Sequence, residues 1–349
     1  MIIQADELLR IVREVLCVER VRPEDADLVA QNLVDANLAG HDTHGVARLP
    51  RYVKDLRDGG INVDAKIKVQ RDGPGVVVFD GDWCFGQVVA MRAVDAAIEK
   101  ARTQGVAVAG VFNSNDVGRL GAFTYKVAQR GFFGLMTVND GGWAPWVAPW
   151  GSYKALFSTN PISAAAPGPG GPAFCVDMAT GVCAASKVKQ ALARSEPLEP
   201  GMILDAKGKP SINPKDLFGP PQGAILTLGA PAAGHKGLAL NLIIDVLSGA
   251  LTGAGCSANP SRDSQGIFLL VINIEAFGGR EAFVTHTEQL LEAIQNAPRQ
   301  DGADAIRIPG HRAETLRKER LRDGIFIEDP TWSQIRELAT ERNITAPTQ

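Results

Sequence analysis

Two histidines and two arginines lie close together in the segment GHDTHGVARLPRYVKDL, residues 40–56. If the chain is helical from residue 44 onward, His44, Arg48 and Tyr52 are spaced four residues apart and share one helical face. An imidazole can donate or accept a proton near neutral pH, and a guanidinium binds a carboxylate through two parallel hydrogen bonds. The hydroxyl of Thr43 could orient the imidazole or contact a substrate. The spacing therefore indicates a site for an anionic substrate that gains or loses a proton; the alternative is a solvated helix face.

The same segment could also hold a metal ion, because HDTH contains two histidines and an aspartate. A metal-dependent phosphohydrolase site of this type needs further histidines upstream, and residues 1–40 contain none. The remaining histidines, His235, His286 and His311, are far away in sequence and form no HxxxH or HExxH pair. We therefore expect no metal site.

The composition is that of a globular, enzyme-sized protein. The chain has 349 residues, of which 45% are hydrophobic and 21% charged, with a net charge of -3. This balance argues against a disordered chain and against nucleic acid as a partner. No apolar run approaches the roughly 20 residues that span a bilayer, and the N-terminal stretch is charged and helical in pattern, so we expect no membrane association and a cytoplasmic location. The five cysteines have no CxxC spacing, which predicts buried thiols.

Helical patterns cover both ends of the chain, whereas strands and helices alternate in the middle. Residues 5–38 predict two helices, residues 46–57 a third, and the tail after Gly310 returns to charged helices. Between them, the runs VVVFDGD, VAVAGVF, FFGLMTV and GIFLLVIN predict strands. This order predicts a central α/β unit, beside which the helices of the two chain ends pack together.

Five stretches, in order along the chain, resemble the motifs of the malate/L-lactate dehydrogenase family that is unrelated to the Rossmann lactate dehydrogenases. They are GHDTHGVARLPRYV, STNPISAAAP, VDMATGVCA, GHKGLALNLIIDVLSGALTGA and AIRIPGH. The resemblance implies NAD(P)-dependent hydride transfer to or from C2 of a 2-oxo or 2-hydroxy acid, or of a cyclic 2-imino acid. Members of the family include malate, L-lactate, ureidoglycolate and sulfolactate dehydrogenases, 2,3-diketo-L-gulonate reductase and piperideine-2-carboxylate reductase.

The resemblance also implies roles for the residues of the first motif. His44 would move the proton, and Arg48 would hold the substrate carboxylate. Thr43 stands where the family usually has serine, and Asp177 would complete the relay by fixing the tautomer of the imidazole. His41 is then a structural residue.

The expected cofactor is NAD or NADP, but the sequence lacks the Rossmann fingerprint for dinucleotide binding. No GxGxxG follows an early strand, and the glycine run at residues 168–172 is broken by proline. The resemblance implies a mixed-sheet α/β (α+β) fold of non-Rossmann type. The cofactor contacts that it implies are Asn160, Pro161, Ile162, Asp177, Met178, Ala179, Thr180, Gly181, His235, Lys236, Pro309, Gly310 and His311. Lys236 opens a long helix after Gly234, where backbone amides and an ammonium could meet a phosphate.

The chain departs from the family's pattern at two positions. Many members carry NSxHxG where this chain has NSNDVG, so that Asp116 replaces a histidine. A carboxylate cannot do the work of an imidazole near neutral pH unless burial raises its pKa strongly. We therefore expect His44 to carry the proton alone, or Asp116 to recognise a cationic or hydroxyl-bearing part of the substrate. At the second position DMATS becomes DMATG, and Gly181 brings no hydroxyl.

We predict an NAD(P)-dependent oxidoreductase of small 2-oxo or 2-hydroxy acids, with Tyr52 and Asp116 beside Arg48 in the substrate site. Reduction of cyclic imino acids is the alternative, and a nonenzymatic binding protein of the same fold is a third reading. The expected organisation is a helical substrate and dimerisation domain, residues 1–75 with 312–349, and an NAD(P)-binding α/β domain, residues 76–311. By the same resemblance we expect a homodimer with its active site near the subunit interface.

Overall fold

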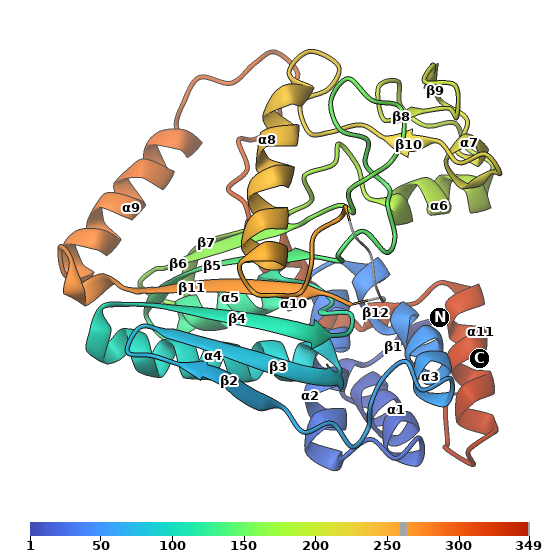
Figure 1. Ribbon diagram of the computed structural model, residues 1–349, viewed down its shortest axis with the longest axis horizontal. Helices are drawn as coiled ribbons and strands as arrows, with labels where there is room; N and C mark the ends of the chain where they lie inside the picture. The colour runs from blue at the N-terminus through green and yellow to red at the C-terminus, as the bar shows by residue number, and fades with distance from the viewer. Residues whose placement is uncertain (259–263, 348–349) are drawn as a thin grey trace.

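The computed structural model describes residues 1–258 and 264–347 and is built around a central sheet (Figure 1). This sheet has seven strands in the order β2-β3-β4-β11-β5-β6-β7. The strands are β2 (Lys68–Asp72), β3 (Val76–Cys84), β4 (Val106–Ser114), β5 (Phe132–Asn139), β6 (Ile162–Pro167), β7 (Pro172–Met178) and β11 (Gly266–Asn273). β3 and β4 run parallel, and every other neighbouring pair is antiparallel. The expected mixed α/β fold of non-Rossmann type is confirmed.

Strand β11 shows why this sheet differs from a doubly wound one. It comes late in the chain, yet it lies between β4 and β5 and is antiparallel to both. Its sequence GIFLLVIN is almost continuously apolar, and Ile267, Leu269 and Val271 are buried. Such a run suits a strand that is covered on both faces of its sheet.

Helices cover both faces of the sheet. α4 (Gly86–Gln104) and α5 (Gly121–Gln129) lie on one face, and α8 (Gly234–Asp245) stands on the other, where it continues into a π-helical turn, Val246–Ala250 (Figure 1). α9 (Arg280–Gln295) has no buried residue and projects from the body of the protein (Figure 1). Among the helices of the described residues, none combines the length and the apolar character that a membrane crossing requires.

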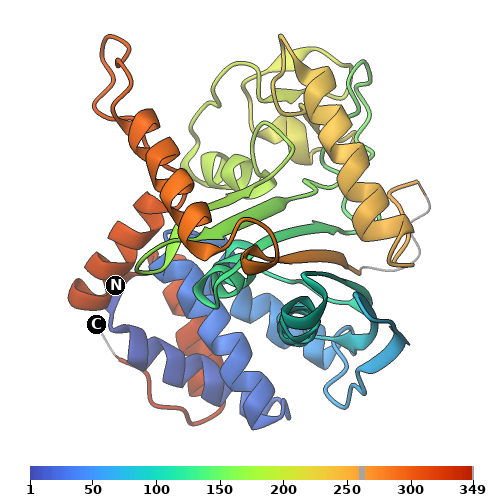
Figure 2. The same ribbon diagram turned by 90° about the vertical axis from the view of Figure 1, so that its left-hand side faces the viewer.

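The two chain ends lie side by side (Figure 2). At the N-terminal end are β1 (Ile2–Ile3), α1 (Ala5–Val18), α2 (Pro23–Leu38) and α3 (Leu49–Arg57); at the C-terminal end are α10 (His311–Asp323), β12 (Ile325–Phe326) and α11 (Asp329–Thr340). β1 pairs with β12 in antiparallel fashion, Ile3 opposite Ile325. The similar charged helical patterns at the two ends of the sequence thus belong to one group of helices.

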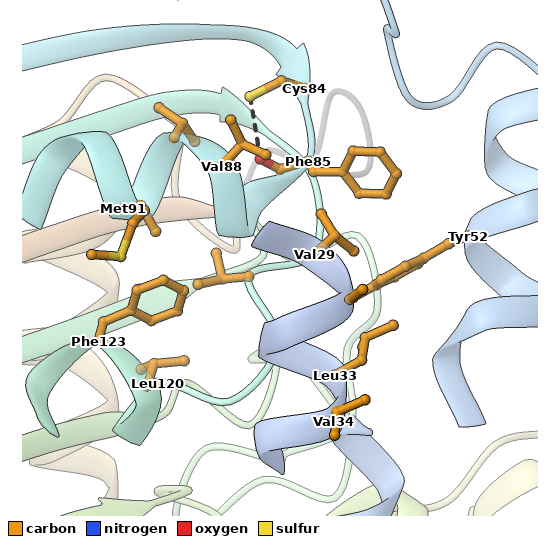
Figure 3. Packing of buried hydrophobic residues seen from close by; sticks show 14 of the residues in the cluster. Val29, Leu33, Val34, Tyr52, Cys84, Phe85, Val88, Met91, Leu120 and Phe123 are labelled. Atoms are coloured by element: carbon orange, nitrogen blue, oxygen red, sulfur yellow. Dashed lines mark hydrogen bonds between the residues drawn. The ribbon is translucent and has the colours of Figure 1, made fainter. Parts of the chain in front are cut away.

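One hydrophobic core joins the terminal helices to the sheet. Its buried members include Leu8 and Leu33 from the helices and Phe79 and Val111 from the strands. Figure 3 shows this contact from close by, with side chains of α2 packed beside Tyr52, Phe85 and Val88. The boundary that the sequence suggests at residues 75 and 76 therefore does not separate two hydrophobic cores.

A smaller lobe between β5 and α8 has a core of its own. It contains α6 (Ala185–Arg194), α7 (Lys215–Phe218) and a three-stranded sheet of β8 (Ile203–Leu204), β9 (Pro210–Ser211) and β10 (Ala224–Ile225). Val147, Phe157, Val188 and Leu217 are buried together at its centre. The sequence pattern predicts one α/β unit over this region and does not indicate a separate lobe.

The helix expected over residues 46–57 is shorter than the sequence suggested. α3 begins at Leu49, and two 3-10 turns, Asp42–His44 and Val46–Arg48, precede it. Pro50 explains the difference, because proline lacks the backbone N–H for an intrahelical bond and its ring clashes with the carbonyl four residues earlier, whereas it is well tolerated in a first turn. The expectation of one continuous helical face from residue 44 was wrong.

Truncation of a side chain in α1 tests the shared core. Ile11 is completely buried, whereas Ile2 is 62% exposed. We expect Ile11→Ala to lower the free energy of unfolding by about 2–5 kcal/mol, because it removes buried methyl groups and leaves a cavity. Ile2→Ala, the matched control, should change it by less than about 0.5 kcal/mol. Urea denaturation measures both, and equal losses would contradict the shared core.

Candidate active site

Asn37 of α2 holds the 3-10 segment that carries His44 through hydrogen bonds. The Asn37 Oδ1 atom accepts a hydrogen bond from the Val46 N–H at 2.8 Å, and its Nδ2 group donates to Asp42 Oδ1 at 2.7 Å. A Cβ atom at Gly45 would lie 2.1 Å from Asn37 Oδ1. Only glycine leaves room for this contact, so the GHDTHG stretch follows the surface of α2 closely.

The same segment is held from the other end of the chain by Arg320 of α10. Its guanidinium donates from Nη1 to Asp42 Oδ1 at 2.7 Å and from Nη2 to Asp42 Oδ2 at 3.2 Å, and it also contacts the carbonyl of Asn37. A bidentate arginine–carboxylate pair fixes direction as well as distance. The C-terminal helices therefore position the histidine segment.

His44, Arg48 and Tyr52 converge on one carboxylate, although they do not share a helix. Arg48 Nη1 lies 3.2 Å from Asp116 Oδ2, and the Tyr52 hydroxyl donates to the same oxygen at 3.1 Å. Gln87, fully buried in α4, donates to the Tyr52 oxygen at 2.6 Å. The structure thus brings the predicted substrate residues together around Asp116, and Gln87 is a supporting residue that the sequence analysis missed.

Asp116 is a buried anion. Burial alone would raise the pKa of its carboxyl, but the charges of Arg48, His44 and Arg51 and the Gly118 N–H outweigh burial and hold that pKa below its usual value. Burial and the Asp116 charge also raise the pKa of Tyr52 well above its usual value. The phenol therefore stays protonated and acts as a donor.

His44 is neutral at physiological pH. Burial lowers the pKa of its imidazole to about 4, helped by the charges of Arg48 and Arg119, and the Asp116 charge opposes this shift only in part. The Thr43 hydroxyl lies 3.2 Å from His44 Nδ1, as the sequence analysis considered. In this state the imidazole can accept a proton from a substrate.

A cleft of about 210 Å³ opens beside these groups. The residues that line it include His44, Arg48, Arg51, Asp116, Asn139, Asp140, Trp146, Ser158, Thr159, Pro161, Ala184, Ser186 and Gln265. They come from the two 3-10 turns, the start of α3, the ends of β4 and β5, the loop between β5 and β6, the start of α6 and the residue before β11. Most of them carry no motif of their own, and sequence reasoning could not have assigned them to one cavity.

The Asp177 carboxylate interacts electrostatically with His41, whereas the family resemblance implies a relay to His44. This carboxylate accepts the Gly121 N–H at 2.7 Å and lies 3.7 Å from Arg119 Nε. Burial raises its pKa, while Arg119, the Gly121 N–H and His41 oppose the shift. Among the described residues, no hydrogen bond joins Asp177 to His44. The imidazole that the Asp177 charge affects is that of His41, whose own pKa is lowered by burial and by Arg119.

Two of the implied cofactor segments lie next to each other because β6 and β7 pair. Ile162 is opposite Met178, and Ser163 is opposite Asp177. The turn before β6 is closed by the side chain of Asn160, which is fully buried and accepts from Ser158 Oγ at 2.7 Å. The Asn160 amide therefore braces this loop.

The segment that follows β7 is also held by hydrogen bonds. The buried Thr180 hydroxyl contacts the carbonyls of Thr159 and Asn160. Gly181 is buried and Ala179 half-buried, whereas the Met178 side chain is exposed. Of these two implied segments, Pro161 is the residue that lines the cleft.

The other implied cofactor residues lie outside the lining of the cleft. His235 and Lys236 are exposed in the first turn of α8, and a Cβ atom at Gly234 would lie 2.2 Å from the Trp150 ring. The segment Pro309–His311 leads into α10 and docks on β7, where the Pro309 carbonyl accepts the Cys175 N–H at 3.0 Å and His311 Nε2 lies 3.2 Å from the Ala173 oxygen. The structure brings Pro309–His311 to β7 and places His235 and Lys236 at a helix N-terminus.

A family model described as malate/L-lactate dehydrogenase matches residues 3–336. A malate dehydrogenase from Pyrococcus abyssi is 36% identical over 345 residues, 97% of this chain and 94% of that protein. The chain belongs to the malate/L-lactate dehydrogenase family. Membership confirms the resemblance seen in the sequence motifs, and the chain is therefore an oxidoreductase.

Solved structures of malate/L-lactate dehydrogenase relatives share the fold along its whole length. A sulfolactate dehydrogenase from Methanocaldococcus jannaschii has a TM-score of 0.88 at 33% identity and covers 99% of this chain and 98% of its own. A delta1-piperideine-2-carboxylate reductase from Pseudomonas syringae pvar. tomato has a TM-score of 0.85 at 29% identity, with 97% and 100% covered. One fold thus occurs in proteins named for different substrates, and only the cleft can discriminate between them.

In the described residues, no group of three or more histidine, cysteine, aspartate or glutamate side chains is arranged to hold a metal ion. The two histidines of HDTH are influenced by different carboxylates: the Asp177 charge acts on the pKa of His41, and the Asp116 charge on that of His44.

Removal of the Arg320 guanidinium tests how α10 holds the histidine segment. We expect Arg320→Gln to speed hydrogen exchange at the His44 and Gly45 amides, which bond to the carbonyls of His41 and Asp42, by about 10-fold, because the bidentate contact with Asp42 is lost. Arg322→Gln is the matched control, since Arg322 is exposed and, within the described residues, its guanidinium hydrogen-bonds to its neighbour Asp323. Exchange measured by mass spectrometry should respond to the first substitution alone, and an equal response to both would contradict the anchoring role.

Proposed function

We propose that this protein is an NAD(P)-dependent oxidoreductase that transfers a hydride to or from C2 of a small 2-oxo or 2-hydroxy acid. The observation that supports this most directly is a neutral imidazole, His44, beside the guanidinium of Arg48 in one cleft. Oxidation of a 2-hydroxy acid needs a group that accepts the hydroxyl proton and a cation that holds the carboxylate. His44 and Arg48 meet these two needs.

In this proposal the residues around Asp116 have separate roles in substrate binding and proton transfer. Arg48 binds the substrate carboxylate, and its direction is fixed because its Nε group donates to the Thr43 carbonyl at 2.9 Å. His44 accepts the hydroxyl proton during oxidation and returns it to the carbonyl oxygen during reduction. Tyr52 and Gln87 hold the Asp116 carboxylate in place, and Asp116 stabilises the imidazolium that forms. Thr43, through its contact with Nδ1, orients the ring.

Asp177 acts on His41 in this scheme. Asp177 lies beside Arg119, and the charges of both act on the pKa of His41. We therefore assign Asp177 to the positioning of the segment that carries both histidines, which differs from the direct relay to His44 that the family resemblance implies.

The chain's own residues fit a dinucleotide at two places. The first turn of α8 presents backbone amides, His235 and the Lys236 ammonium to solvent, a combination that suits a phosphate. Pro161 carries the loop between β5 and β6 into the cleft, where a nicotinamide ring would meet the substrate. When bound there, NAD(P) supplies or accepts the hydride. Ile162, Asp177 to Gly181 and Pro309 to His311 complete the proposed cofactor contacts.

Reduction of a cyclic imino acid is the second candidate. A protonated C=N group carries a positive charge, and the buried anion Asp116 beside Arg48 provides a complementary charge. The likeness to a delta1-piperideine-2-carboxylate reductase supports this candidate too. Turnover of pyruvate-like acids against piperideine- and pyrroline-carboxylates, with NADH and with NADPH, separates the two candidates.

We also propose that the protein forms a homodimer. α8 and the turn after it expose the apolar side chains of Leu242, Ile243, Val246 and Leu251, with exposed fractions between 47% and 62%. Contiguous exposed apolar surface of this kind is typical of a protein interface. Analytical ultracentrifugation measures the state directly.

Loss of the imidazole tests the proposed proton transfer. We expect His44→Ala to lower turnover by at least ~100-fold, the usual scale for a general acid/base, while NAD(P)H still binds by fluorescence titration. His286→Ala provides the matched control, because His286 is exposed on α9, away from the lining of the cleft. Near-normal turnover in His44→Ala would overturn the assignment.

The pH dependence tests the charge state of His44. Oxidation requires the neutral imidazole, so kcat/KM should stay level as the pH falls from about 7 and decline only near the lowered pKa of about 4. Reduction requires the protonated imidazole, so its kcat/KM should rise as the pH falls toward the same value. Steady-state rates in both directions between about pH 4 and pH 8 measure this. A midpoint near about 6.5, the ordinary value for histidine, would contradict the lowered pKa of His44.

A further inference from the structure

Among the described residues, charged groups of both signs line the cleft. Two arginines, Arg48 and Arg51, and two aspartates, Asp116 and Asp140, contribute to its lining. Arg48 forms an ion pair with Asp116 at 3.2 Å, and Arg51 forms one with Asp55 at 3.2 Å. None of the described residues that line the cleft is a lysine. A second negative charge on a substrate would therefore meet cations that already face a carboxylate of the protein.

Asp116 is the acid whose position matters most. Its side chain is only 12% exposed, and its two oxygens are fixed by Arg48 and Tyr52 on one side and by the Gly118 N–H at 3.2 Å on the other. A carboxylate held in this way cannot turn away from a bound ligand. Like charges that are brought close together at a partly buried site repel strongly, because water screens them poorly there.

The guanidinium of Arg48 still has capacity for one carboxylate. Its Nε group donates to the Thr43 carbonyl, and Nη1 faces Asp116. Within the described part of the chain, Nη2 has no hydrogen-bond partner, and Arg48 lines the cleft. One substrate carboxylate can bind there beside His44. The remainder of the substrate then lies in a cleft that the Asp116 carboxylate also lines.

We propose that this cleft selects 2-oxo and 2-hydroxy acids with a single carboxylate and a neutral or cationic side group, and that Asp116 excludes acids with a second negative charge. The proposal rests on the proposed function, in which Arg48 binds the substrate carboxylate. Malate and sulfolactate, after which relatives of this chain are named, are dianions. Specificity here depends on a repulsive element as much as on an attractive one.

A pair of substrates of nearly equal shape tests the proposal. Oxaloacetate and its 4-amide, 2-oxosuccinamate, differ chiefly by one charge. We expect the wild-type kcat/KM to be at least ~10-fold higher for the amide. Asp116→Asn removes the charge and keeps an oxygen for the Tyr52 hydroxyl, so it should bring the two values to within about 3-fold of each other. Equal values in the wild type, or an unchanged ratio in Asp116→Asn, would overturn the proposal.

A control variant and a binding measurement show whether the effect is specific to the Asp116 charge. Asp64→Asn makes the same change in net charge on an exposed loop, and it should leave the ratio as in the wild type. Binding of succinamate and succinate, which lack the keto group, is measured by calorimetry on the wild-type protein. We expect at least ~10-fold tighter binding of succinamate. Equal or tighter binding of succinate would overturn the charge selection.

The binding measurement distinguishes this proposal from the proposed function. If no 2-oxo or cyclic imino acid is reduced with NADH or with NADPH, the proposed reaction fails, whereas the preference for succinamate is still observed and supports the charge selection. If the dianion oxaloacetate is reduced as well as its amide, the reaction holds and the charge selection fails.

Discussion

The buried ion pair between Arg48 and Asp116 is the interaction around which the cleft is organised. A charge that leaves water must be paired and hydrogen-bonded, and here each partner provides the compensation for the other. The pair joins the segment after α2 to the end of β4, and Tyr52 and Gln87 extend it into the core. Its charges also set the state of His44, whose pKa burial and Arg48 lower while Asp116 opposes the shift.

The terminal helices are part of the site although they contribute few residues to its lining. α2 supplies Asn37, and α10 supplies Arg320, and both hold Asp42 in the 3-10 segment that carries His44. This arrangement depends on the pairing of β1 with β12 and on the core that the two chain ends share with the sheet. Stability at the chain ends and geometry at His44 are therefore coupled.

The motifs of the cofactor segments are largely structural in this chain. Asn160 and Thr180 are fully buried. The Asn160 side chain accepts from Ser158 in its own loop, and the Thr180 hydroxyl donates to the Asn160 carbonyl, so both preserve the shape of the turn that carries Pro161 into the cleft. His235 and Lys236, by contrast, are exposed at a helix start, where a ligand can reach them. A motif therefore combines residues that contact a ligand with residues that hold those contacts in position, and only burial distinguishes the two.

The sequence by itself determined the family, the mixed α/β class, the terminal helices and the clustering of His44, Arg48 and Tyr52, because periodicity and local motifs carry that information. It did not determine the start of α3 at Leu49, the small lobe, or the contribution of Gln87 and Arg320, which lie far from the motif along the chain. Nor could it show that the Asp177 charge acts on the pKa of His41 and the Asp116 charge on that of His44. Charge pairing depends on distances of a few ångströms between strands and helices that are remote in sequence, and only the tertiary structure sets those distances.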